Sequence, residues 1–339
     1  MSGIGVDFQA VQAGKFRRYN RGVWKEAIDV RTQLSNAADA SRSLRGYMAA
    51  RRILRKFHPN VVLVKGGNVG WPIGLAASHL KIPLVLHESD VEMGKGNRLL
   101  IKQAQAVATA FPVTYYKNLP SGVDAKLHFV GNPVRPELVS KQTKTEHKSG
   151  ERLVLLVIGG SQGAHVINEF VFDNLKSLTE GYSVVHITGK ADVEHARIHK
   201  SRLPVENQPH YEIFDFVADP GLMCKIYGAA DVALTRPGIN TIVELAANKV
   251  VPIVIAPFSN RHQWVNAQAL EKLAAARVFR QEEISILGIK AAIDRLYDRD
   301  TERQHLLTQL GKLYHPDSAT KIEQLLLAAG QEGRYATGR

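Results

Sequence analysis

The segment LVLLVIGGSQGA over residues 153–164 is the clearest chemical feature of this sequence, because its pattern could form a phosphate-binding loop. The apolar run that opens the segment is typical of a parallel strand buried on both faces. The glycines, Gly163 among them, permit a tight turn. The amides of Ser161 and Gln162 then open a helix whose positive dipole end attracts anions. An ordinary strand-to-helix loop can also carry glycines, so the segment alone leaves both interpretations open.

Further polar residues follow later strands. Glu244 lies eight residues after Arg236 in a strand-turn-helix pattern. Its carboxylate could accept hydrogen bonds from both hydroxyls of a ribose, or it could be a first-turn helix acid favoured by the dipole. Arg236 could bind a phosphate, or pair with a nearby acid and shape its loop. Gln263 and Asn266 share one helical turn and suit a hydroxyl-rich sugar, whereas His262 alone is more typical of a surface or capping residue.

Alternating strands and helices must position these residues, and the alternation predicts parallel sheets with helices on both faces. In the first half we expect helices at 72–80 and 97–104. The segment Val6–Val11 is at best a weak strand, so the first domain is either small or lacks its first βα unit. In the second half, helices are expected near 284–297 and 319–329. The predicted strands are 61–64, 84–87, 106–108, 153–158, 183–188, 211–214, 232–235, 251–256 and 277–279.

The polar stretch 139–152 contains no strand-forming residues and is predicted to link two domains. The first domain would then span residues 1–138 and the second residues 153–339. A chain of 339 residues is long enough for two such α/β domains with separate cores.

Composition narrows the class of protein. The single cysteine, Cys224, excludes an internal disulfide framework and fits a reducing cytoplasm. No apolar run reaches the roughly 18 residues of a membrane span, and the first residues lack a signal-peptide pattern, so we expect a soluble or peripheral protein. The net charge of +12 indicates an anionic partner. Nucleic acid is not expected, because no nucleic-acid-binding module is recognisable.

Basic and aromatic residues alternate near the start of the chain, which suits the headgroup layer of an anionic membrane. The alternative is the solvated face of a helix at 42–56 whose apolar side holds Leu44, Met48, Ile53 and Leu54. The residues concerned are Lys15, Phe16, Arg17, Arg18, Tyr19, Arg21, Trp24 and Lys25, followed by Arg42, Arg45, Arg51, Arg52, Arg55 and Lys56.

Taken together and in order, several motifs resemble the MurG family of glycosyltransferases, from about Gly3 to Ala329. The resemblance implies two Rossmann-like domains facing a cleft, the GT-B architecture, with an acceptor and membrane-facing domain first and a UDP-sugar-binding domain second. The motifs are GKFRRY at 14–19, KGGNVGWPIGLAA at 65–77, HESD at 87–90, GNPVR at 131–135, GGSQGA at 159–164, FDFV at 214–217, TRPGINTIVELA at 235–246 and HQWVNA at 262–267.

The resemblance also implies an activity. The family transfers N-acetylglucosamine from UDP-N-acetylglucosamine to undecaprenyl-diphosphate-linked muramoyl-pentapeptide in peptidoglycan synthesis, with inversion and without metal or other cofactor, at the cytoplasmic face of the plasma membrane. By resemblance, the diphosphate is held by Ser161, Gln162 and Gly163, and Arg236 and Thr241 lie near the phosphates. Val217 contacts uracil through its backbone, Glu244 binds the ribose, and the sugar lies at His262, Gln263 and Asn266. The acceptor side is lined by Asn97 and Arg135.

The sequence departs from the family at the start, where the usual GGTGGH-type loop with its candidate general base does not occur. An inverting transfer needs a base for the attacking hydroxyl. Glu88 and Asp90 follow the strand at 84–87 and are the acids left near the expected cleft, although either could be a loop cap. A lipid glycosyltransferase with another acceptor and a UDP-sugar-binding protein without catalysis therefore stay open as alternatives.

Overall fold

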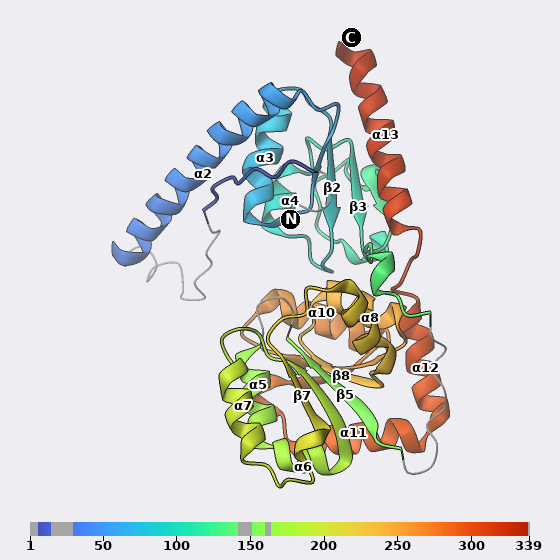
Figure 1. Ribbon diagram of the computed structural model, residues 1–339. Coiled ribbons are helices and arrows are strands. Elements are labelled where there is room, and N and C mark those ends of the chain that lie inside the picture. Colours follow the sequence, from blue (N-terminus) through green and yellow to red (C-terminus); the bar gives the residue numbers. More distant parts are fainter. Residues whose placement is uncertain (1–5, 15–29, 142–150, 160–163, 338–339) are drawn as a thin grey trace. The chain divides into compact units, whose positions relative to one another are not determined.

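The computed structural model describes residues 6–14, 30–141, 151–159 and 164–337, the backbone alone over 30–38 and 332–337. It divides the chain into two compact units. Unit 1 comprises Met1–Val130 together with Thr320–Arg339, and unit 2 comprises Gly131–Ala319. The strand and helix alternation of the sequence is confirmed in both units (Figure 1).

Unit 1 contains a parallel sheet of order β1-β2-β3-β4 within the described residues. The strands predicted at 61–64, 84–87 and 106–108 form β1, β2 and β3, while β4 has no clear signal in the sequence. The weak strand expected at Val6–Val11 is wrong, because residues 6–14 form no strand. The elements are α2 (Val30–Phe57), β1 (Val62–Val64), α3 (Gly67–His79), β2 (Leu84–Glu88), α4 (Lys95–Leu100), β3 (Ala106–Thr109), β4 (Leu127–Phe129) and the last helix, α13 (Ser318–Thr337).

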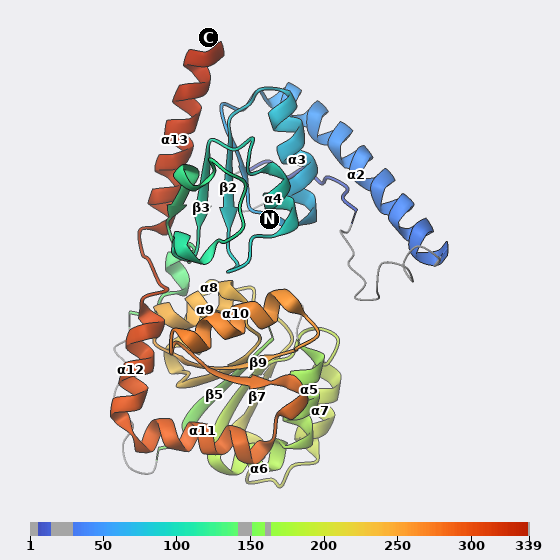
Figure 2. The same cartoon turned by 180° about the vertical axis from the view of Figure 1, so that it is seen from behind.

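The helix α13 returns to unit 1 and lies beside β3, as Figures 1 and 2 show from opposite sides. Ala329 packs with Val85 and Ala106, and Ile322 packs with Ala108 and Val130. The apolar face of this helix therefore completes the core of unit 1. The prediction that residues 153–339 form one domain is corrected for this last segment.

The boundary between the units falls at Val130 and Gly131, earlier than the predicted end at residue 138. Side-chain amides fasten the following segment to unit 2. Asn132 Nδ2 donates to Asn240 Oδ1 (2.5 Å), and Asn248 Nδ2 donates to the Leu138 carbonyl (3.0 Å). Gly131 has φ +82°, and a Cβ there would lie 2.6 Å from the His315 ring, so this crossing requires glycine.

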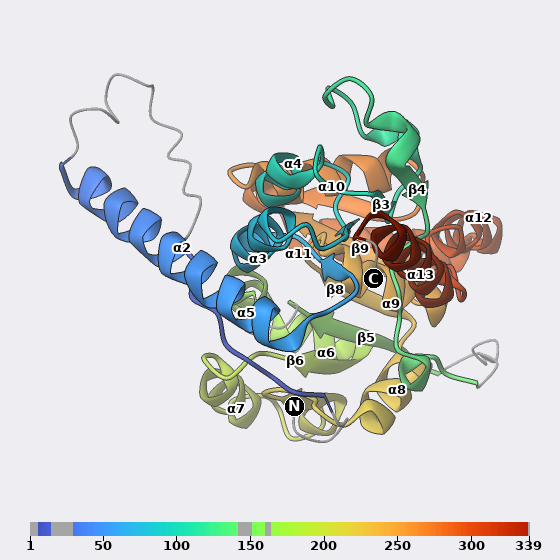
Figure 3. The same cartoon turned by 90° about the horizontal axis from the view of Figure 1, so that it is seen from above.

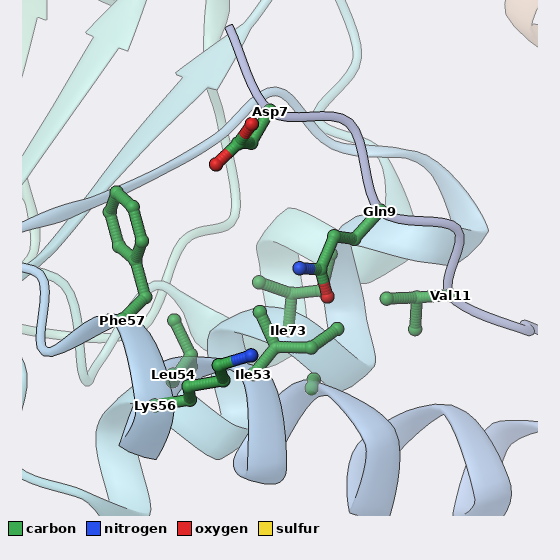
Figure 4. Close-up of a pocket in the computed structure, with 9 residues that line it drawn as sticks. Asp7, Gln9, Val11, Ile53, Leu54, Lys56, Phe57 and Ile73 are labelled. Atoms are coloured by element: carbon green, nitrogen blue, oxygen red, sulfur yellow. The ribbon is translucent and has the colours of Figure 1, made fainter.

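The helix α2 packs along α3 in unit 1 (Figure 3). On one side, α2, α3 and the extended segment 6–14 enclose a groove of about 410 Å³ (Figure 4). Its lining is mainly apolar, with Asp7, Gln9 and Lys56 as the polar members. The lining residues are Asp7, Gln9, Val11, Ala50, Ile53, Leu54, Lys56, Phe57 and Ile73.

Unit 2 is built on a parallel sheet of order β10-β9-β8-β5-β6-β7 within the described residues. The helices α9, α10 and α12 pack against β9, and α7 packs against β7 (Figure 2). The elements are β5 (Leu153–Ile158), α5 (His165–Asp173), α6 (Leu175–Gly181), β6 (Tyr182–Ile187), α7 (Val193–Ser201), β7 (Tyr211–Phe214), α8 (Pro220–Ala229), β8 (Val232–Thr235), α9 (Ile239–Ala247), β9 (Val251–Ala256), α10 (Arg261–Lys272), β10 (Arg277–Arg280), α11 (Ile286–Asp298) and α12 (Asp300–Gly311).

In the described part of the chain, no helix is both long enough and apolar enough to cross a membrane.

Candidate functional site

The sheet of unit 2 has a switch point between β5 and β8. From β5 the chain builds outward through β6 and β7, and it then returns to place β8, β9 and β10 on the other side. Ile158 pairs with Thr235, and Thr235 pairs with Val254, so these strands end at one edge. Ligands of doubly wound sheets bind outside the carboxyl ends at such a point. The candidate donor residues lie in the loops and helices that leave this edge.

The predicted phosphate loop leads from β5 to α5, as the sequence indicated. The strand ends at Ile158 and the helix begins at His165. Ser161, Gln162 and Gly163 lie outside the described residues, so their role at the phosphates stays a prediction. The described flank is polar, because His165 Nδ1 lies 3.0 Å from Asp192 Oδ1 and this hydrogen bond raises the pKa of His165.

The helix α9 carries Thr241 and Glu244, three residues apart and therefore on one face. Both side chains are half-buried. Because α9 begins at Ile239, Glu244 lies in its second turn, and the alternative of a first-turn acid is wrong. The Tyr227 hydroxyl, from α8, donates to Glu244 Oε2 at 2.6 Å. Sequence patterns gave no signal for this partner, since Tyr227 lies in a largely apolar helix.

Arg236 follows β8 directly and is half-buried. Its Nη1 donates to Gln281 Oε1 (2.6 Å) and to the Ile255 carbonyl (3.4 Å). Burial lowers the pKa of its guanidinium, while the charge of Glu282 raises it. These contacts agree with the alternative in which Arg236 shapes its loop, but its side-chain partner is the amide of Gln281 and not an acid.

The helix α10 begins at Arg261, after the N-cap residue Asn260. Gln263 is half-buried in the first turn, and His262 is exposed. Asn266 is only 3% exposed, and its Nδ2 donates to the Pro237 carbonyl at 3.2 Å. Asn266 thus ties α10 to the loop after β8, and Gln263 is the more accessible amide of the predicted sugar-binding pair.

Two further predicted residues belong to unit 2. Val217 is half-buried in the loop between β7 and α8, where Asp219 caps α8 by accepting from the amides of Gly221 and Leu222. Arg135 was expected on the acceptor side, but it lies in unit 2. It precedes the 3₁₀ turn η3 (Pro136–Leu138), which packs on α8.

Glu88 and Asp90, the candidate bases, lie at the carboxyl end of β2 in unit 1, as predicted. Glu88 is 5% exposed. Its Oε1 accepts from the Asp90 amide (3.1 Å), and its Oε2 accepts from the Gly94 amide (2.8 Å) and from Asn97 Nδ2 (2.9 Å). Burial raises the pKa of Glu88, against the effect of these hydrogen bonds. The contacts are those of the loop-cap alternative for Glu88, while the Asp90 side chain is half-exposed.

Asn97 was expected to line the acceptor site, but its side chain is 1% exposed. Its Nδ2 also donates to the His87 carbonyl at 3.1 Å. A Cβ on Gly66, where φ is +75°, would lie 3.2 Å from the same amide nitrogen. Asn97 therefore holds the loop after β2 against the glycine turn before α3.

Among the residues whose placement is described, no three histidine, cysteine or acidic side chains form a group that could hold a metal ion. The absence of an obligatory metal stays a prediction.

Comparison with solved structures defines the fold. MurG from Acinetobacter baumannii superposes with a TM-score of 0.65 at 24% sequence identity, over 85% of this chain and 80% of that chain. A putative UDP-N-acetylglucosamine 2-epimerase from Listeria monocytogenes gives a TM-score of 0.61 at 15% identity, over 86% and 80%. Likeness at these identities concerns the fold alone. The fold is α/β, with two Rossmann-like domains, and enzymes of different activity share it.

Comparison of sequences is more specific. Residues 5–109 match the glycosyltransferase family 28 N-terminal domain, and residues 154–321 match the glycosyltransferase family 28 C-terminal domain. A protein of Shouchella clausii named "UDP-N-acetylglucosamine--N-acetylmuramyl-(pentapeptide) pyrophosphoryl-undecaprenol N-acetylglucosamine transferase" is 34% identical over 303 residues, 87% of this chain and 78% of that protein. The chain belongs to glycosyltransferase family 28, which confirms the resemblance seen in its motifs.

Proposed function

We propose that this chain transfers N-acetylglucosamine from UDP-N-acetylglucosamine to undecaprenyl-diphosphate-linked muramoyl-pentapeptide, with inversion at the anomeric carbon. The observation that carries the proposal is the sequence relationship to the Shouchella clausii transferase over 87% of the chain. The switch-point edge of unit 2 supports it, since the residues expected to bind the donor follow β5, β8 and β9 there.

In the proposed reaction the acceptor hydroxyl attacks the anomeric carbon while UDP departs. Asp90 takes the proton from that hydroxyl, because its carboxylate is the more accessible of the two candidates. The loop of Ser161 and Gln162 and the N-terminus of α5 stabilise the negative charge that grows on the UDP leaving group. Glu244 accepts hydrogen bonds from the ribose, and Gln263 binds the sugar.

The test is turnover by the purified chain with UDP-N-acetylglucosamine and the lipid-linked acceptor, alongside calorimetric titration with UDP. We expect release of UDP that depends on the acceptor and continues at the same rate in EDTA. Binding of UDP without turnover would favour a sugar-nucleotide-binding protein, and turnover with another lipid-linked acceptor would favour the related transferase. A chain that does not bind UDP would contradict the donor site.

We further propose that α2 docks on an anionic membrane surface at the cytoplasmic face. Leu44 and Met48 are 63% and 58% exposed, although the alternative of a solvated basic face requires them on the buried side of α2. Arg45, Arg52 and Arg55 are exposed on the same part of the helix. Apolar side chains that insert between lipid headgroups, with cations beside them, are typical of interfacial helices. The basic residues at 15–25 lie outside the described residues.

A further inference from the structure

Tyr227 is a buried tyrosine that contacts Glu244, the residue proposed to bind the ribose. Its side chain is fully buried in unit 2, and its hydroxyl donates to Glu244 Oε2 at 2.6 Å. A hydrogen bond to a carboxylate at this distance is of the charge-assisted kind, which is about twice as strong as one between neutral groups. The bond joins α8 to α9, two helices that are separate in the chain.

The electrostatics keep Tyr227 a donor. Burial raises its pKa, and the negative charge of Glu244 raises it further, while the nearby positive charge of Arg135 lowers it. The hydroxyl therefore stays protonated at any physiological pH, and the proton of the hydrogen bond belongs to Tyr227. Glu244 in turn is half-buried, and one of its carboxylate oxygens is held by the buried hydroxyl of Tyr227.

The anchor matters because a glutamate has three side-chain torsions to fix before it can accept two hydroxyls at once. Fixing a flexible side chain on ligand binding costs conformational entropy and so lowers the affinity. A tyrosine that already holds one carboxylate oxygen removes part of this cost, since Tyr227 itself is locked by burial. Arg135 immediately precedes η3, which packs on α8, the helix that carries Tyr227.

We propose that Tyr227 is a positioning residue for the ribose of the nucleotide, acting through the carboxylate of Glu244. The inference rests on the proposed role of Glu244 at the ribose. Tyr227 does not touch the ligand. It fixes the orientation in which Glu244 meets the ribose hydroxyls, and so it affects affinity for nucleotides that carry those hydroxyls.

The test is Tyr227→Phe, which removes only the hydroxyl and keeps the ring in the core. Calorimetry would use the full chain with UDP and with the 2′,3′-dideoxy analogue, which lacks both ribose hydroxyls. We expect UDP to bind roughly threefold more weakly, because the ligand must then order the Glu244 side chain without the help of the anchor. Binding of the dideoxy analogue should not change, and the KM for UDP-N-acetylglucosamine should rise while kcat stays the same.

A matched control is Tyr182→Phe. The Tyr182 hydroxyl donates to Asp294 Oδ1 at 3.3 Å in the same unit, and the tyrosine is also buried. This variant removes another, longer tyrosine-carboxylate bond of unit 2 and should leave the affinity for both nucleotides unchanged. Equal weakening of UDP and its dideoxy analogue by Tyr227→Phe would mean a merely structural role and would overturn the inference.

Glu244→Ala separates this inference from the proposal on which it rests. We expect this variant to lose affinity for UDP, and Tyr227→Phe to add no further loss when combined with it. If Glu244→Ala binds UDP normally, the proposed ribose site itself fails. If Glu244→Ala weakens binding and Tyr227→Phe does not, the ribose site stands and the role of Tyr227 is wrong.

Discussion

Glu88 and Asp90 are two residues apart, yet their surroundings suit them to different tasks. The carboxylate of Glu88 is buried, and its oxygens hold the amides of Asp90 and Gly94 and the side chain of Asn97. Removing one acceptor from such a set leaves a buried donor unpaired, which costs about 1–3 kcal/mol. We therefore expect Glu88 to stabilise the loop and Asp90 to act on the substrate.

Asp90→Asn should lower kcat by about 10²-fold to 10⁴-fold, the usual contribution of a general base. The affinity for UDP should stay the same, because the residues proposed to bind the donor belong to unit 2. Glu88→Gln should instead lower the stability of unit 1 by about 1–2 kcal/mol, because its amide nitrogen cannot accept from a backbone N–H. Steady-state kinetics and thermal unfolding of both variants distinguish the two roles. A Glu88→Gln variant that folds normally and loses kcat, beside an active Asp90→Asn, would reverse the assignment.

At the same scale, the sequence predicted residue types better than residue surroundings. Asn97 and Asn266 were sensible candidates for binding a sugar or acceptor, because amides both donate and accept. Both are buried and donate to backbone carbonyls, those of His87 and Pro237. An amide that satisfies a loop carbonyl and one that binds a sugar look alike in a sequence. Only the fold around each of them tells the two apart.

Elements were predicted more accurately than single side chains. The strands at 153–158, 232–235 and 251–256 have the expected bounds, because buried parallel strands are mainly apolar runs between turn residues. The edge strand at 211–214 also has the expected bounds, although it contains the exposed Glu212. The helix α2 is an exception, because the prediction of which side chains it buries is only partly right. Ile53 is half-buried and Leu54 is buried, as expected, but Leu44 and Met48 are exposed.

If α2 docks on anionic lipid, reversing two of its exposed charges should weaken that docking. Each basic residue near such a surface contributes about 1 kcal/mol, so Arg45→Glu with Arg52→Glu should weaken binding at least tenfold. Co-sedimentation with phosphatidylglycerol-containing vesicles measures this effect. The loss should shrink at high salt, because screening removes the attraction that the variant lacks.

A control with the same change in net charge is Arg202→Glu with Lys312→Glu, two exposed residues of unit 2. This variant should bind the vesicles nearly as well as the unaltered chain. Equal losses in the two variants would mean that only the net charge of +12 attracts the membrane and that α2 has no special part in it.

At the scale of the whole molecule, the chain crosses from one unit to the other and back. The sequence indicated two domains, but the return of α13 to unit 1 was not predicted, since an amphipathic helix can cover either sheet equally well. The contacts of Ile322 and Ala329 with unit 1 decide the matter in the structure. Residues 131–141 likewise carry no pattern that assigns them to unit 2, because their attachment depends on Asn132 and Asn248.

We expect thermal unfolding of the full chain to show two transitions, as is common when two domains have separate cores. UDP at a concentration of about one hundred times its Kd should stabilise only the transition of unit 2, by about 2.7 kcal/mol. Ile322→Ala should destabilise only the transition of unit 1, by about 2 kcal/mol, because it leaves a cavity against Ala108 and Val130. Leu327→Ala on the same helix is the control, because Leu327 is 59% exposed. If Ile322→Ala lowers the transition that UDP raises, α13 is coupled to the donor unit and the division of the chain is wrong.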